Sequence, residues 1–183
     1  MLTIGHSTLP IEMFLQALQQ SKCGTLVDVR TIPRSRRNPQ YEQPALFAAL
    51  EHAGIRPIWR KGLGGLRHAL PRERSVNNGW RNESFRGYAD YMQTEEFANE
   101  IEWLMGLPNF GGVAVMCAEA VPWRCHRSLI ADAVLARGGA VEDVFVSQGG
   151  KTERRPHAMT SFARVEGTRV WYPPEIGELF DPS

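Results

Sequence analysis

The 183-residue sequence predicts an α/β fold, a single domain over residues 1–183 with a mostly parallel central sheet and helices on both faces. Short apolar segments that are typical of strands alternate with segments whose apolar residues recur at helical spacing. The chain is long enough to bury one substantial core, and it shows no internal repeat, low-complexity tract or linker. These observations favour one continuous domain.

The first strand–helix–strand unit lies at the N-terminus. Residues 2–7 form a short apolar strand, and Ser7 or Thr8 is expected to cap the helix that follows. The apolar face of that helix consists of Ile11, Phe14, Leu15 and Leu18. Residues 24–30 then form a second strand. A unit of this length is typical of a right-handed crossover between parallel strands.

Segment 30–86 is expected to be a basic, loop-rich stretch along one rim of the sheet. It holds 12 Arg and Lys residues against 4 Asp and Glu, a balance of +8, whereas the remainder has a balance of −7. We expect a short helix at 45–54 and an edge strand at 55–60, where Pro57 cannot donate a ladder hydrogen bond. Residues 61–80 lack periodicity, and so long a connection inside a compact domain is more often functional or mobile than accidental.

The second half continues the alternation of helices and strands. Residues 83–107 are predicted to be helical, in two pieces that meet near Thr94, and 111–119 form a fully buried type of strand. A helix at 125–139 and a strand at 140–146 follow. The tail, 147–183, has strand character near "TRVWYP".

Several classes of protein are disfavoured by the composition. The longest apolar runs are too short to span a bilayer, and "MLTIGHST" lacks the basic start and apolar stretch of a signal peptide. The 3 cysteines are an odd number in a chain of this length and do not indicate a disulfide framework. We therefore expect a cytoplasmic protein with no membrane partner.

Polar side chains follow three of the predicted strands where those strands end. Ligands of parallel sheets bind beyond the carboxyl ends of the strands. The residues there are Gly5-His6-Ser7, Asp28-Val29-Arg30 and Cys117-Ala118-Glu119. We expect these three strand ends to build one shared site.

The catalytic candidates at this rim are Cys117, Glu119, Cys125 and His6. Either cysteine is a potential nucleophile, and His6 and Glu119 are the acid–base candidates. Cys125 lies at a helix start, where exposed amides and the helix dipole lower a thiol pKa and attract anions. The alternatives are that the thiols only pack in the core and that Glu119 only pairs with an arginine.

Arginine makes up 18 of the 21 basic residues. Its planar guanidinium holds phosphate through two hydrogen bonds, so the expected partner is a phosphate-bearing small molecule or a nucleic acid. The residues expected to bind this anion are Ser7, Asp28, Arg30, Arg34, Arg36, Arg67, His126 and Arg127. No cofactor is predicted, and no metal ligands are assigned because the usual zinc spacings are missing.

Taken together, several motifs resemble the DUF488 family of uncharacterised proteins. They are "TIGHST", "LVDVRTIPRSRRNPQY", "LGG", "FRGYADYM", "VMCAE", "CHRSLIAD" and "PHAMTSFARVEG". The resemblance implies a single α/β domain and adds Tyr88 to the candidate binding residues. The other positions that it implies are shared are His6, Ser7, Asp28, Arg30, Pro33, Ser35, Gly64, Gly65, Gly87, Cys117, Glu119, Cys125, His126 and Arg127.

Three functional hypotheses follow. The first is an enzyme that acts on a nucleotide or nucleic acid at the rim with Cys, His and Glu chemistry. The second is a non-catalytic nucleic-acid-binding module that uses the arginines of 30–86. The third is a metal or thiol-redox protein that uses Cys117, Cys125, His126 and His6.

Overall fold

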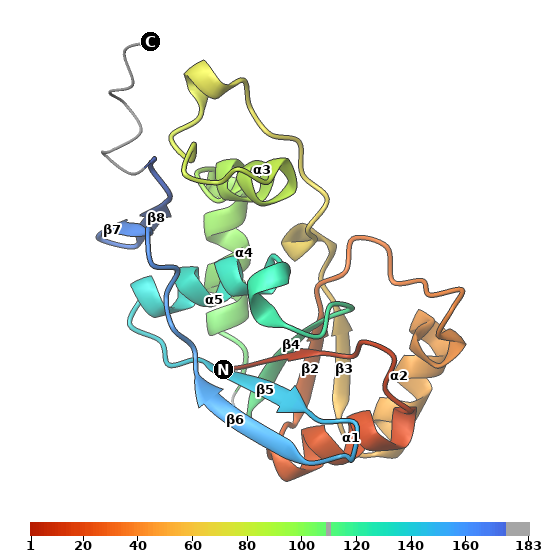
Figure 1. Ribbon diagram of the computed structural model, residues 1–183. Coiled ribbons are helices and arrows are strands. Elements are labelled where there is room, and N and C mark those ends of the chain that lie inside the picture. The colour runs from red at the N-terminus through yellow and green to blue at the C-terminus, as the bar shows by residue number, and fades with distance from the viewer. Residues whose placement is uncertain (109–110, 175–183) are drawn as a thin grey trace.

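The computed structural model describes residues 1–108 and 111–174, and it has the predicted α/β fold with a six-stranded sheet (Figure 1). The strands are β1 (Leu2–Gly5), β2 (Thr25–Asp28), β3 (Arg56–Trp59), β4 (Val113–Cys117), β5 (Glu142–Val146) and β6 (Thr152–Pro156). Their order in the sheet is β3-β2-β4-β1-β5-β6, and all pairings are parallel except that of β6 with β5. A separate hairpin contains β7 (Arg164–Glu166) and β8 (Arg169–Trp171).

Helices cover both faces of the sheet, as predicted. They are α1 (Ile11–Gln20), α2 (Gln43–His52), α3 (Glu83–Tyr91), α4 (Glu95–Met105) and α5 (Arg127–Ala136). In Figure 1, α1 and α2 lie on one side of the strands, and α3, α4 and α5 lie on the other. Within the described residues, no helix has both the length and the apolar character needed to cross a membrane.

Strand β4 shows why the sheet is buried on both faces. Val113 and Val115 belong to the apolar core under α3, α4 and α5, whereas Ala114 and Met116 belong to the core under α1 and α2. Successive side chains of a strand point to opposite faces, so a strand covered on both sides is apolar at every position. This explains the continuous apolar run at 113–116.

The helix boundaries match the prediction in one place and differ in another. The break between α3 and α4 lies at Thr94, whose hydroxyl accepts a hydrogen bond from the Phe97 amide at 3.2 Å. The expected cap of α1 by Ser7 or Thr8 is wrong, because Pro10 precedes the helix and makes no side-chain cap. Ser7 instead has a φ of 46° and donates its amide to the Ala118 carbonyl at the end of β4.

Of the two edge strands, one was predicted from the sequence and the other was not. Strand β3 lies at one edge, as the proline in it predicted. Strand β6, at the other edge, was not predicted. Its sequence "TERRP" is charged and lacks the apolar alternation of a half-buried strand, but charged side chains are typical of exposed edges.

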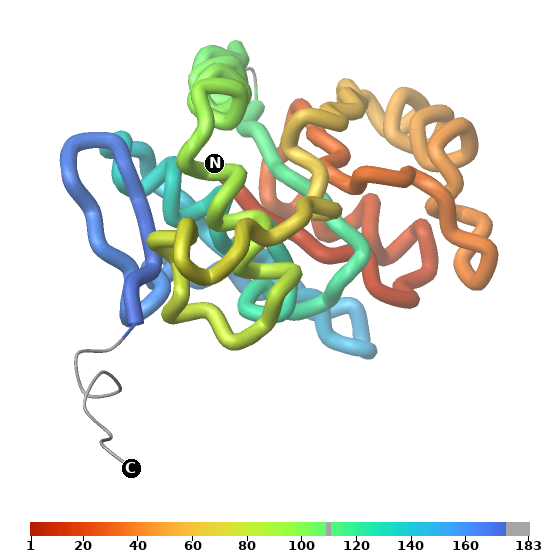
Figure 2. The backbone as a smooth tube through the Cα atoms, turned by 90° about the horizontal axis from the view of Figure 1, so that it is seen from above, coloured from red at the N-terminus to blue at the C-terminus, as the bar shows by residue number. Residues whose placement is uncertain are grey.

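The long connection 61–80 contains only short helical turns at Lys61–Leu63 and Arg72–Arg74. It is nevertheless fixed to α3 by Asp90. The Asp90 carboxylate accepts hydrogen bonds from the Leu70 amide at 2.9 Å, the Ser75 hydroxyl at 2.6 Å and the Asn77 side-chain amide at 2.9 Å. Figure 2 shows this connection and α3, in yellow to yellow-green, folded together between the red and orange N-terminal part and the dark-blue hairpin.

A buried polar network attaches the C-terminal segment to the sheet. The His157 imidazole contacts Asp143 of β5 at 2.8 Å and Asp132 of α5 at 3.1 Å. Tyr172 donates its hydroxyl to Asp132 at 2.8 Å. Burial alone lowers the pKa of His157, but the hydrogen bonds to the two carboxylates outweigh burial and raise that pKa to about 9. The protonated imidazole is therefore the form that the fold stabilises.

Because the folded pKa of His157 exceeds its unfolded value of 6.5, its contribution to stability is complete below pH 6.5 and is lost as pH rises through about 9. We expect His157→Gln to cost on the order of 2 kcal/mol at pH 6 and much less at pH 10. Urea unfolding of both proteins across this range measures the difference. An unfolding penalty that is the same at both pH values would contradict the assignment.

Candidate functional site

The carboxyl ends of β1, β2 and β4 meet at one edge of the sheet, as the sequence predicted. Gly5 is in register with Cys117, and Asp28 is in register with Met116. The His6 amide donates to the Cys117 carbonyl at 3.0 Å, and the Val29 amide donates to the Met116 carbonyl at 3.0 Å. Backbone pairing therefore brings residues from three distant parts of the chain to the same rim.

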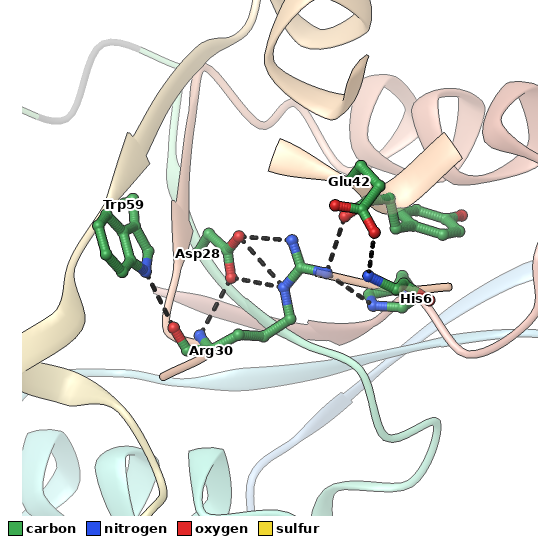
Figure 3. Close-up of polar contacts among 7 residues, drawn as sticks. His6, Asp28, Arg30, Glu42 and Trp59 are labelled. Atoms are coloured by element: carbon green, nitrogen blue, oxygen red, sulfur yellow. Dashed lines mark hydrogen bonds and ion pairs between the residues drawn. The ribbon is translucent and has the colours of Figure 1, made fainter. Parts of the chain in front are cut away.

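A buried ion pair between Asp28 and Arg30 lies at the end of β2 (Figure 3). The Arg30 guanidinium donates through Nη2 at 2.7 Å and Nε at 2.9 Å to the Asp28 carboxylate, and through Nη1 at 2.9 Å to the Tyr41 carbonyl. The Trp59 indole donates to the Arg30 carbonyl at 2.9 Å. Burial raises the pKa of Asp28, and the hydrogen bonds from Arg30 act in the opposite direction.

His6 supports this ion pair and does not line the cavity described below. Its ring stacks on Tyr41 with centroids 3.9 Å apart, and its Nδ1 lies 2.9 Å from the Ser7 carbonyl. Nδ1 therefore carries the proton, which leaves Nε2 to accept from the Arg30 Nη1 at 3.4 Å. Burial lowers the pKa of His6 to about 4, so the imidazole is neutral at neutral pH.

Cys117, Cys125 and His126 converge at the rim, where β4 ends and α5 begins. One sulfur from each cysteine and one ring nitrogen of His126 all lie within 4.8 Å of one another. These three side chains, called the thiol–imidazole cluster below, could hold a metal ion. The third hypothesis from the sequence grouped these residues with His6, but the distance between them could not be predicted because it depends on how the loop 118–124 folds back.

The hydrogen bonds within the cluster make the two thiols unequal. A hydrogen bond from Cys125 lowers the pKa of Cys117 well below its usual range, although burial opposes the change, and His126 lowers it further. The same interaction raises the pKa of Cys125, and burial adds to that increase. Cys117 is therefore the thiol of the pair that ionises more readily.

The orientation of His126 is fixed by its neighbours. Its Nε2 lies 3.2 Å from the Val29 carbonyl, so the proton belongs on Nε2 and the Nδ1 lone pair faces the sulfur of Cys125, 3.7 Å away. The backbone of Gly65 packs closely against the same ring. A Cβ atom at that position would lie 2.5 Å from Nδ1, so only glycine fits without movement of the ring.

Arg127 and Gly5 hold the loop that carries Glu119. The fully buried Arg127 guanidinium donates to the carbonyls of Glu119 and of Ala120, the latter at 2.8 Å. The loop passes so close to β1 that a Cβ atom on Gly5 would lie 1.8 Å from the Glu119 carbonyl oxygen. These contacts use the charge of Arg127 inside the protein and leave the Glu119 side chain exposed.

A cavity of about 430 Å³ opens at this rim. The thiol–imidazole cluster forms part of its wall, and Ile32, Leu66 and Phe85 supply apolar surface. Four charged side chains also line it. They are Arg30, Arg34, Arg124 and Glu119. Volume and lining are in the range of small-molecule sites, which combine apolar walls with a few convergent polar groups.

The cavity contains six of the residues predicted from the sequence: Arg30, Arg34, Cys117, Glu119, Cys125 and His126. Other predicted residues are used elsewhere. Arg67 stacks on Tyr91, 3.6 Å from the ring centre, and the buried Tyr88 donates to the Leu63 carbonyl at 3.1 Å. His6, Asp28 and Arg127 support the rim from behind, Ser7 pairs with the end of β4, and the exposed Arg36 is outside the cavity lining.

Arg124 also lines the cavity, although it was not among the binding candidates predicted from the sequence. It reaches the cavity from the turn Pro122–Arg124. The signal was its position directly before Cys125. Among residues 1–108 and 111–174, neither Arg34 nor Arg124 has a partner for its guanidinium. Both charges are therefore available to a ligand.

Replacing Asp28 by asparagine leaves the buried guanidinium of Arg30 without a countercharge. We expect Asp28→Asn to lower the free energy of unfolding by about 3–5 kcal/mol, as for other broken buried pairs. Chemical denaturation measures this loss. The matched control is Glu153→Gln, which breaks an exposed pair with Arg155 at 2.8 Å and should change stability little. Equal effects of the two substitutions would contradict the role given to burial.

Comparison with known proteins identifies a family and no activity. The family model described as "Domain of unknown function DUF488" matches residues 10–134, which is more than half of the chain. The match contains the ion pair of β2, both cysteines, His126 and the whole cavity lining. No curated protein and no solved structure matches the sequence. The chain belongs to the DUF488 family.

Proposed function

We propose that this protein is an enzyme that acts on a phosphate-bearing ligand, a nucleotide or a nucleic-acid end, in the rim cavity. The observation that carries the proposal is that one cavity contains both the thiol–imidazole cluster and two arginines, Arg34 and Arg124, whose guanidinium groups have no partner among the described residues. The cluster supplies reactive groups. The arginines supply positive charge in the planar form that suits phosphate oxygens.

The three arginines that line the cavity are not equally suited to bind an anion. Arg30 lines the wall, but its charge is compensated by Asp28 at 2.7 Å. Arg34 and Arg124 have no such countercharge among the described residues, so they supply the net positive field that attracts an anion. We assign phosphate binding to these two residues and positioning of the loop after β2 to Arg30.

Glu119 is the acid–base group of this proposal. It lines the cavity on the loop that Arg127 and Gly5 hold in place, and its side chain is exposed to solvent. His6 was the other candidate, but it is buried behind Arg30 and its ring nitrogens are already used. A group that moves a proton during reaction must reach the ligand, and Glu119 meets this condition where His6 does not.

The ligand's apolar part has a place in the same cavity. Ile32 and Leu66 are exposed large apolar residues, and both line the wall together with Phe85. A flat, partly apolar group such as a nucleobase can pack on this surface while its phosphate contacts the arginines. This pairing of apolar wall and positive charge favours a nucleotide over inorganic phosphate.

Binding of a nucleoside monophosphate and of a short single-stranded oligonucleotide tests the arginine assignment. We expect Arg34→Gln and Arg124→Gln each to weaken binding roughly tenfold, because each removes charge-assisted hydrogen bonds. Arg36→Gln is the matched control, since Arg36 lies in the same loop but outside the cavity lining. Calorimetric titration at fixed salt gives the three affinities.

Cysteine variants, together with the arginine variants, distinguish an enzyme from a non-catalytic binding module. An enzyme predicts turnover of phosphate esters that Cys117→Ser lowers by about 100-fold or more while Cys23→Ala, a buried thiol elsewhere, does not. A module that follows a nucleic-acid backbone predicts no turnover, equal losses for Arg34→Gln and Arg36→Gln, and binding that weakens steeply with salt. That second pattern would refute the proposal.

A further inference from the structure

We propose that Cys117, Cys125 and His126 bind one Zn²⁺ ion, with the fourth coordination position open to the rim cavity. The first support is convergence, because the two sulfurs and one ring nitrogen lie within 4.8 Å of one another. Thiolate and imidazole are the ligand types that Zn²⁺ prefers. The metal site itself does not depend on the proposed function, but a role for the metal in turnover does.

The distance between the Cys125 sulfur and the His126 ring suits tetrahedral coordination. Zinc bonds to cysteine sulfur at about 2.3 Å and to histidine nitrogen at about 2.0 Å, which places two such ligands about 3.5 Å apart at a tetrahedral angle. The distance between the Cys125 sulfur and His126 Nδ1 is 3.7 Å. An ion can therefore sit between these atoms without a large movement of either side chain.

The surroundings of His126 are those of a metal ligand. Metal-bound histidines usually donate their second ring nitrogen to a carbonyl or carboxylate, which fixes the ring and the tautomer. Nε2 of His126 lies 3.2 Å from the Val29 carbonyl, so Nδ1 faces the sulfurs without a proton. The backbone of Gly65 packs against the same ring and helps to hold it, because a side chain at this position would collide with Nδ1.

The cluster offers three ligands, and all three line the cavity. Structural zinc sites are closed by four protein ligands, whereas catalytic sites have three and leave one position to water or substrate. Glu119 lines the same cavity but is not part of the group of close ligand atoms. The open position therefore faces the space in which Arg34 and Arg124 would hold a phosphate.

A thiol-redox pair is the competing explanation for two close cysteines. A disulfide requires only the two sulfurs and gives no role to a third group. Here the imidazole of His126 points its free nitrogen at the sulfurs and is locked there by Val29 and Gly65. The unusual spacing, seven residues between the cysteines and a histidine directly after the second, explains why sequence patterns do not reveal the site.

The experiment uses the full-length protein, stripped with a chelator under reducing conditions and then titrated with Zn²⁺ or with Co²⁺ as a spectroscopic probe. We expect one metal ion per chain and, with Co²⁺, the visible absorption of a tetrahedral site plus a thiolate charge-transfer band. Cys117→Ser, Cys125→Ser and His126→Ala should each weaken Zn²⁺ binding at least about 100-fold, more than loss of an outer-shell partner does. Cys23→Ala is the matched control and should bind like the wild type.

Absence of stoichiometric Zn²⁺ binding and of a thiolate–Co²⁺ band in folded wild-type protein would overturn the metal site. So would a Cys117–Cys125 disulfide that forms in air while added Zn²⁺ fails to protect the thiols from oxidation. Metal binding without any affinity for nucleotides would leave the metal site standing and refute the proposed function. Nucleotide turnover by metal-free protein, unchanged by added Zn²⁺, would leave the proposed function standing and refute a role for the metal in turnover.

Discussion

The buried ion pair between Asp28 and Arg30 is the interaction on which the geometry of the rim depends. It lies where β2 leaves the sheet, and the same guanidinium reaches the Tyr41 carbonyl and His6. A charge in this position is costly unless every donor has an acceptor, so the pair constrains the chain on all sides. The guanidinium thereby connects the loop after β2 to the end of β1, and the backbone carbonyl of Arg30 accepts a hydrogen bond from the indole of Trp59 on the edge strand.

The reactive part of the rim is built on this frame. The Val29 carbonyl, between the two members of the ion pair, orients His126, and His126 contributes to the environment of the two cysteines. The Arg127 guanidinium donates hydrogen bonds to backbone carbonyls of the loop that carries Glu119. The arginines that line the cavity without a described partner, Arg34 and Arg124, are both exposed. Buried arginines thus fix the backbone, and exposed ones remain for a ligand.

Strand periodicity and the position of strand ends were sufficient to predict the fold and the location of the rim. The apolar run at 113–116, the proline of β3 and the helix break at Thr94 each have a local cause that the sequence displays. Strand β6 escaped prediction because its stability comes from pairing with β5 and its side chains are those of an exposed edge.

Which arginines bind the protein's own groups and which line the cavity could not be predicted from the sequence, for a different reason. Whether a guanidinium faces a carboxylate, a carbonyl or open space depends on tertiary contacts. Arg67, Arg127 and Arg34 look equivalent in sequence, but only Arg34 lines the cavity. The close approach of Cys117 to Cys125 likewise depends on the path of the loop between them, which no local pattern encodes. Family membership, established over residues 10–134, adds no reaction to this account.

The central claim is that the thiol–imidazole cluster and the unpartnered arginines serve one ligand in one cavity. The most direct test is the rate at which a small alkylating agent modifies Cys117 in metal-free protein, followed by mass spectrometry with and without a saturating nucleoside monophosphate. The account predicts that the nucleotide slows modification of Cys117 severalfold, and that Arg34→Gln needs more nucleotide for the same protection. Nucleotide that binds fully without changing the rate at Cys117 would show that the ligand lies elsewhere and would contradict the account.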